Sequence, residues 1–187
     1  VFNDFSEIQV EELIDYHRKN GGLSRYVKIR YFYENILDKH ITDEEVFRYA
    51  EKFSKLMKAK LVDKNNLIND SVQFIKENFN NYNFHIVSGS DQEELRFLCS
   101  ELHLSKYFLS IHGSPIAKKV LVKNLMIEHA YDENQTILIG DSINDYEAAK
   151  KNKLVFFGFN DISLKRKSKF YIDNFTEFNF FLNNLNH

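Results

Sequence analysis

Several residue types that often define a protein class are scarce in this sequence. The 187 residues include one cysteine, one proline and no tryptophan. With no second thiol, Cys99 cannot form a disulfide within the chain, and the apolar helical pattern around it predicts a buried structural residue. No apolar run is long enough to span a membrane, and no signal-peptide pattern opens the chain. These absences predict a cytoplasmic protein without a membrane partner.

A surplus of positive charge is missing as well. The chain has 25 Lys and Arg against 27 Asp and Glu, which gives a formal net charge of -2 at pH 7. Because nothing in this balance would neutralise the phosphates of a duplex, nucleic acid is not expected as the main partner. Hydrophobic residues make up 43% of the chain, close to the globular average, so a true hydrophobic core is expected.

The chain divides into an all-helical part and a part in which strands and helices alternate. Before Leu61, apolar residues recur at helical spacing and predict three antiparallel helices, the third opened by a capping box between Thr42 and Glu45. After Leu61, a helix capped by Asp70 or Ser71 is followed by alternating strands and helices, which indicates a parallel sheet. The predicted strands are residues 84–87, 108–111, 136–139, 154–157 and 170–172. We expect an α/β fold with a Rossmann-like parallel sheet in residues 67–187 and a helical domain in residues 1–66.

The stretch from residue 136 to residue 150, TILIGDSINDYEAAK, carries two carboxylates just after a buried strand. Asp141 and Asp145 would lie at the carboxyl end of that strand, where open α/β sheets bind their ligands. Two neighbouring carboxylates stay charged most easily beside a cation, and Mg²⁺ prefers oxygen ligands. A turn at Asp141 and a helix cap at Asp145 explain the same pattern equally well when it is taken alone.

Two other predicted strand ends also carry polar residues. Ser88, Gly89 and Ser90 follow the first strand, and a hydroxyl with free backbone N–H groups before a helix suits an anion, although a serine N-cap is about as common. Lys118 follows the second strand, one turn into the next helix, where a cation is unfavourable for the helix dipole. Its neighbour Lys119 competes for the same role, and either lysine could be solvated. A hydroxyl, a lysine and two carboxylates on successive parallel strands suit Mg²⁺-dependent phosphoryl transfer.

With these residues in place, the sequence resembles the haloacid dehalogenase (HAD) superfamily, in its phosphatase branch with a helical, C1-type cap. The segments FHIVSGS (84–90), GSPIAK (113–118) and GDSIND (140–145) resemble the second, third and fourth motifs of that family. The resemblance implies that residues 1–66 form the cap and that a small phosphorylated metabolite is the substrate. It further implies that Ser88 and Lys118 are catalytic, and that Gly89 and Ser90 help to hold the phosphate. Asp141 and Asp145 would hold Mg²⁺, with Asp145 either supporting the metal or orienting Lys118.

The cap segment adds two tentative substrate residues. Its stretch NGGLSR (20–25), with Lys28 nearby, resembles a cap signature of some relatives. Arg25 and Lys28 would then close over the leaving group. A charged helix face exposed to solvent is the alternative explanation for both residues.

The first motif of the family, a strand that ends in Asp-x-Asp and supplies the nucleophile, has no counterpart in these 187 residues. We expect the chain to begin just inside the cap, to leave a gap in the sheet, and to hold its metal weakly. The intact enzyme would form an aspartyl-phosphate, whereas this chain would be inactive.

A non-catalytic module that binds a phospho-ligand or a protein on the same fold is the alternative function. A nucleotide-binding Rossmann enzyme is disfavoured, because the Gly-x-Gly-x-x-Gly fingerprint is absent. The identity of the substrate and the oligomeric state stay open at this point.

Overall fold

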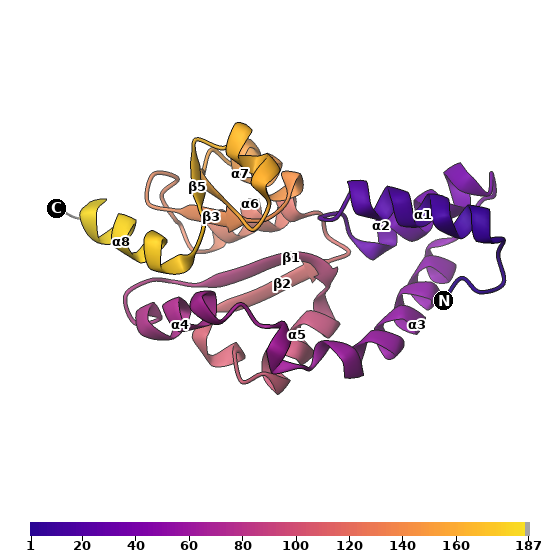
Figure 1. Ribbon diagram of the computed structural model, residues 1–187, viewed down its shortest axis with the longest axis horizontal. Helices are drawn as coiled ribbons and strands as arrows, with labels where there is room; N and C mark the ends of the chain where they lie inside the picture. The colour runs from indigo at the N-terminus through magenta and orange to yellow at the C-terminus, as the bar shows by residue number, and fades with distance from the viewer. Residues whose placement is uncertain (186–187) are drawn as a thin grey trace.

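The computed structural model describes residues 1–185 as a helical part at one end of the molecule and an α/β part beside it (Figure 1). The helical part consists of α1 (Glu7–Lys19), α2 (Arg25–Tyr31) and α3 (Asp43–Leu61). The last helix, α8 (Phe175–Leu185), lies at the opposite end. The arrangement confirms the expected α/β class with helices first.

The third helix of the first part begins where the sequence predicts it. At α3, the Thr42 hydroxyl accepts from the Glu45 N–H, and the Glu45 carboxylate accepts from the Thr42 N–H at 2.9 Å, which is the predicted capping box. At α2, Ser24 caps the first turn, and the helix continues as a π-helical turn, η1 (Phe32–Ile36). The buried residues that hold these helices together are Ile29, Ile41, Val46 and Ala50.

The strands form two parallel sheets rather than one. In the first sheet, β1 (His85–Asp91) pairs with β2 (Ser110–Ser114). In the second, β3 (Ile137–Gly140), β4 (Val155–Phe159) and β5 (Phe170–Ile172) follow in that order. One edge of β1 and one edge of β3 therefore lack a strand partner among the described residues, as the sequence predicts for a sheet without its first strand.

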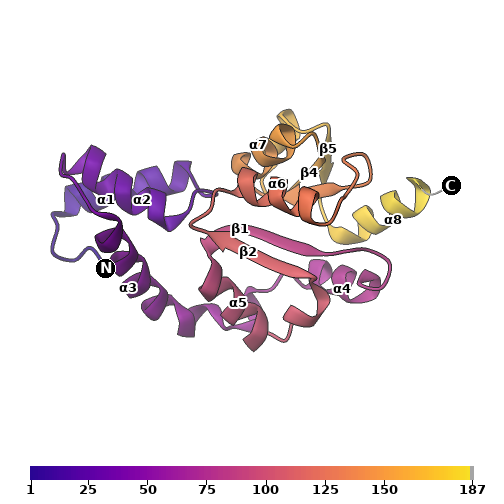
Figure 2. The ribbon, with the colours of Figure 1, turned by 180° about the vertical axis from the view of Figure 1, so that it is seen from behind.

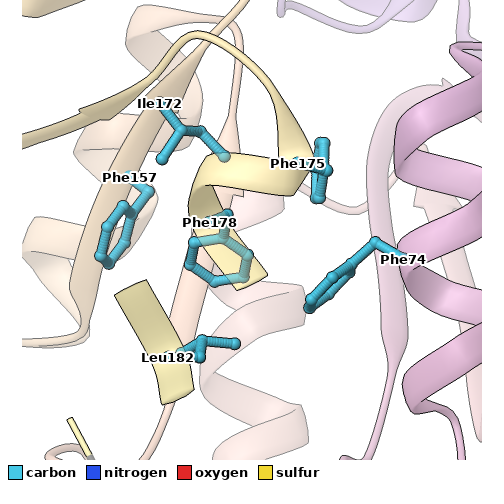
Figure 3. Packing of buried hydrophobic residues seen from close by; sticks show 6 residues of the cluster. All are labelled: Phe74, Phe157, Ile172, Phe175, Phe178 and Leu182. Carbon is cyan, nitrogen blue, oxygen red and sulfur yellow. The ribbon is translucent and has the colours of Figure 1, made fainter. Parts of the chain in front are cut away.

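Helices cover the two sheets and join them into one core. Figures 1 and 2 show α4 (Asn69–Asn78) and α5 (Gln92–Glu101) on one side of β1 and β2, with α6 (Lys118–Glu128) and α7 (Ile143–Lys151) toward β3 and β4. Val87 of β1 and Leu138 of β3 pack against the same buried cluster. A second cluster fixes α8 against α4 and the second sheet, and Figure 3 shows its members, Phe74, Phe157, Ile172, Phe175, Phe178 and Leu182. Both sheets are thus held by shared apolar packing.

Some boundaries differ from the prediction because long-range partners decide them. β1 continues through residues 88–91 instead of ending at Val87, since Asp91 still pairs with Ser114 of β2 beyond an irregularity. α6 begins at Lys118, so this lysine is the first residue of the helix rather than one turn inside it. Asp70 does not cap its own helix: its carboxylate accepts from the Phe175 N–H at the start of α8, 2.8 Å away.

Cys99 is buried, as predicted, and burial raises the pKa of its thiol. Within the part of the chain that the structure describes, no helix is long and apolar enough to cross a bilayer.

The amino ends of β1 and β2 carry a hydrogen-bonded histidine. The ring nitrogens of His85 contact the Ser110 hydroxyl at 2.7 Å and the Tyr131 hydroxyl at 2.9 Å, and the rings of His85 and His129 lie 4.8 Å apart. Burial, followed by the nearby His129 and His112, lowers the pKa of His85 to about 4. Glu128 acts weakly in the opposite direction.

We therefore expect acid to destabilise the fold through His85. In the unfolded chain His85 takes up a proton near its ordinary pKa of 6.5, whereas in the folded chain it stays neutral until the pH falls to about 4. Between these values the unfolded chain binds the extra proton, so the free energy of unfolding should fall as the pH falls from 6.5 to 4. Urea titrations of the chain and of His85→Gln across this range measure the effect.

The His85→Gln variant should show a flatter decline, because Gln carries no proton in either state. The exposed His40 supplies the matched control, and His40→Gln should follow the parent chain. Identical pH profiles for all three proteins would contradict the assignment to His85.

Candidate active site

One cavity of about 1420 Å³ lies between the helical part and the carboxyl ends of the strands. Of the predicted site residues, all except Asp145 line it: Arg25, Lys28, Ser88, Gly89, Ser90, Lys118 and Asp141. These residues come from α2, β1, the start of α6 and the turn after β3, which are far apart in sequence. The fold therefore brings the predicted residues to a single place.

Lys118 is held by a carboxylate at the base of this cavity. Its Nζ donates to Oδ1 of Asp145, and both side chains are nearly buried, with 12% and 7% of their surfaces exposed. The other Asp145 oxygen, Oδ2, accepts from the Ser142 N–H at 3.1 Å and from the Ser142 hydroxyl at 2.6 Å. The N-cap of α7 is therefore Ser142 and not Asp145. Asp145, the third residue of the helix, completes the capping box and also holds Lys118.

Asp141 is the predicted metal residue that faces the cavity. Burial raises the pKa of its carboxyl group, and the neighbouring Asp145 raises it further, while Lys118 opposes the shift. A cation beside Asp141 would favour the charged carboxylate against both effects.

The donor set fits one side of a Mg²⁺ site. Among residues 1–185, no group of three or more His, Cys, Asp and Glu side chains could hold a metal ion. Mg²⁺ nevertheless retains several waters in proteins and binds through one or two carboxylates. Asp141 can serve as such a ligand, whereas both oxygens of Asp145 are occupied by protein donors.

The Ser88–Ser90 segment lines the cavity in an extended conformation. The Ser88 hydroxyl accepts from the Ser90 N–H at 3.1 Å. Helix α5 begins only after it, with Asp91 as the N-cap that accepts from the Glu94 N–H at 3.0 Å. The N-cap is therefore an aspartate and not a serine, which leaves the serines available to the cavity.

Two glycines let the helical part approach the strand ends. A Cβ atom on Gly89 would lie 2.6 Å from the carbonyl oxygen of Gly22, and one on Gly22 would lie 2.9 Å from Cβ of Ser142. Real Cβ atoms essentially never approach so closely. The glycine-rich turn between α1 and α2 is therefore packed directly on the Ser88–Ser90 segment and on the turn after β3.

Arg25 joins the helical part to α5 through a buried ion pair. Its guanidinium donates to both oxygens of Glu94, with Nη1 to Oε2 at 3.1 Å, and also to the Ser54 hydroxyl at 2.6 Å. Only 14% of the Arg25 side chain and 2% of the Glu94 side chain are exposed. Beside this pair, the Tyr26 hydroxyl donates to Asp91, and burial followed by this hydrogen bond raises the pKa of Tyr26.

We expect Arg25 and Glu94 to contribute to stability as a unit. Glu94→Gln should cost about 3–5 kcal/mol, because it leaves a buried guanidinium without its counter-charge. Arg25→Met should cost a similar amount for the converse reason, and the double variant should lose far less than the sum. Urea unfolding of the three variants measures the coupling, and losses that add to within about 0.5 kcal/mol would contradict it.

Four further residues contact the predicted site residues or their neighbours and were not predicted from the sequence: His17, Tyr26, Asp91 and Glu94. His17 contacts Lys28, with Nδ1 of the ring 3.0 Å from the ammonium nitrogen. No local signal marks these residues, since each fits an ordinary helical pattern or an ordinary cap. Lys28 was singled out only through the resemblance of residues 20–25, with Lys28 nearby, to a cap signature of some relatives.

The sequence profile of the haloacid dehalogenase-like hydrolases matches residues 4–159, which is most of the chain. The chain belongs to this family. A comparison with curated protein sequences finds no match.

Solved structures of other haloacid dehalogenase-like proteins share the fold at low identity. A hydrolase of this family from Streptococcus pneumoniae is 14% identical with a TM-score of 0.63, over 94% of this chain and 90% of the other. A HAD hydrolase from Entamoeba histolytica is 20% identical with a TM-score of 0.70, over 92% and 79%. A structure described as a predicted phosphoglycolate phosphatase from Haemophilus somnus is 14% identical with a TM-score of 0.63, over 91% and 87%.

Proposed function

We propose that this haloacid dehalogenase-like hydrolase is a Mg²⁺-dependent phosphomonoesterase that acts on a small phosphorylated metabolite in the cytoplasm. The observation that carries the proposal is the position of Lys118, fixed by Asp145 at a cavity that Ser88 and Asp141 also line. A buried lysine, a hydroxyl and a carboxylate around one cavity suit a group that carries negative charge on oxygen.

Each residue has a separate role in this proposal. The Ser88 hydroxyl and the backbone N–H group of Gly89 would bind phosphate oxygens, and the Ser90 N–H, which donates to the Ser88 oxygen, would help by orienting that hydroxyl. Lys118 would offset negative charge on the phosphate as it transfers, and Asp145 would keep the ammonium group in place. Both effects stabilise the transition state more than the free substrate when the groups are fixed in advance.

Asp141 would hold Mg²⁺ in the proposed enzyme. When bound, the metal would spread the charge of the transferring phosphoryl group. Asp145 contributes as the partner of Lys118 and as a negative charge near the metal.

The nucleophile is proposed to be the first aspartate of an Asp-x-Asp pair on a strand between β1 and β3 in the intact protein, where it would form an aspartyl-phosphate. The free edges of these two strands can each accept a parallel neighbour. In the same scheme, residues 1–66 are the cap domain and residues 67–187 the core domain, and Arg25 and Lys28 are the cap residues nearest the leaving group.

The 187-residue chain alone tests this proposal. Because it lacks the proposed nucleophile, it should show no Mg²⁺-dependent hydrolysis above background in a screen of phosphorylated metabolites. Magnesium-dependent turnover by this chain that survives Asp141→Asn would contradict both the nucleophile and the metal assignment. A chain that neither turns over nor binds phosphate would instead favour a binding module for another ligand.

A further inference from the structure

Lys28 is a buried cation without an acidic partner. Only 9% of the residue is exposed, and its ammonium group contacts Nδ1 of His17 at 3.0 Å and donates to the Gly21 carbonyl at 3.3 Å. No carboxylate of the described residues lies within ion-pair distance of it. Glu7 and Glu11 line the same cavity, but Glu11 contacts Arg18 instead, at 3.6 Å. A buried charge is normally paired, so this one is available to an anion from outside the chain.

The other cations of the cavity are already accounted for. Arg25 pairs with Glu94 and Lys118 pairs with Asp145, whereas Lys60 is exposed to solvent. Lys28 differs from all three, because it combines burial with neutral partners. Burial lowers the pKa of Lys28, and burial followed by the charge of Lys28 lowers the pKa of His17. Both shifts are those of a basic pair that lacks a counter-charge.

The pair also lies close to the proposed phosphate site. The carbonyl that Lys28 contacts belongs to Gly21, and the next residue, Gly22, packs directly on Gly89 and Ser142. The carbonyl group that Lys28 contacts is therefore one residue away from the glycine that packs on the proposed phosphate-binding segment. Lys28 and the Ser88–Ser90 segment also line the same cavity.

From this arrangement we infer that Lys28, supported by His17, binds a second anionic group of the substrate. The inference rests on the proposed function and narrows its substrate class to phosphomonoesters that carry a carboxylate or a second phosphate away from the scissile phosphate. Arg25 is then a positioning residue that holds the helical part on α5, and it is not the group that binds the distal anion.

Three probes test this inference by calorimetric titration of the 187-residue chain in the presence of Mg²⁺. Ethyl phosphate has no second anion, phosphoglycolate adds a carboxylate, and ethylene glycol bisphosphate adds a phosphate. Phosphoglycolate and ethylene glycol bisphosphate should each bind at least about ten-fold more tightly than ethyl phosphate, because their second anion gains a buried charge-assisted contact. Lys28→Met should remove this difference and leave the affinity for ethyl phosphate unchanged. A preference for only one of the two would identify which anion Lys28 binds.

Matched variants separate this inference from the proposed function. Lys60→Met, at the exposed lysine of the same cavity, should keep the preference, and so should Lys28→Arg, which keeps the charge. Lys118→Met should weaken all three probes. If Lys28→Met weakens ethyl phosphate equally, or if the parent chain binds all three alike, the inference is wrong while the phosphate site stands. If no probe binds the parent chain, the phosphate site fails and the inference fails with it.

A spectroscopic measurement covers the case in which Lys28→Met does not fold. The ¹⁵N signal of the Lys28 ammonium in the parent chain should shift on addition of phosphoglycolate and not on addition of ethyl phosphate. Equal shifts with both probes would overturn the inference.

Discussion

A strand that ends in Asp-x-Asp, joined in front of Val1 by a short linker, should switch on magnesium-dependent hydrolysis of p-nitrophenyl phosphate. We expect a rate at least about a thousand-fold above that of the 187-residue chain, because a covalent route needs its nucleophile. The first three residues line the same cavity as Ser88 and Asp141, and β1 and β3 each keep an edge without a strand partner among the described residues. The initial rate in the presence and absence of Mg²⁺ measures the effect.

The same fusion with Asn in place of the first aspartate of the strand is the control. It can fill the gap and pair with both sheets, yet it should stay inactive. If this control is as active as the Asp-x-Asp fusion, the nucleophile lies elsewhere. If both fusions are inactive but fold with a completed sheet, the proposed reaction itself is wrong.

Removal of the Lys118 ammonium should have a large effect on stability. Lys118→Met leaves the Asp145 carboxylate, only 7% exposed, without its counter-charge, and should lower the free energy of unfolding by about 3–5 kcal/mol. Lys118→Met combined with Asp145→Asn should be less destabilised than Lys118→Met alone, because the uncompensated charge is then gone. Urea unfolding at neutral pH measures all of these values.

The adjacent exposed lysine provides the comparison for this experiment. Lys119→Met should change the free energy of unfolding by no more than about 0.5 kcal/mol, as surface substitutions usually do. The double variant is Lys118→Met with Asp145→Asn. If its loss of stability equals the sum of the losses of the two single variants, Lys118 and Asp145 act independently, which would contradict their direct contact.

The candidate site residues could be predicted from the sequence because they follow short buried strands. Asp141 follows the run TILIG, and Ser88 follows FHIV, so each could be placed at the carboxyl end of a parallel strand. The unpaired edges of β1 and β3 among the described residues were also foreseeable, since the Asp-x-Asp strand has no counterpart in the 187 residues. In each case the signal lies within a few residues of the feature that it predicts.

Features decided by distant residues could not be predicted in the same way. The Arg25–Glu94 pair joins positions 69 residues apart, and nothing in either helix identifies the partner of the other. Asp70 serves α8 rather than its own helix because the fold brings Phe175 to it. Likewise, the sequence places Lys28 on a helix, but only the packing of α1 against α2 shows that it is buried beside His17.

The central claim is that the cavity binds phosphate between Ser88, Lys118 and Asp141. Titration of inorganic phosphate into the 187-residue chain, followed by ³¹P NMR with and without Mg²⁺, tests it most directly. We predict a single site that Mg²⁺ strengthens, that Lys118→Met weakens by at least about ten-fold, and that Lys119→Met leaves unchanged. Equal phosphate affinity in the parent chain and in Lys118→Met would contradict the account.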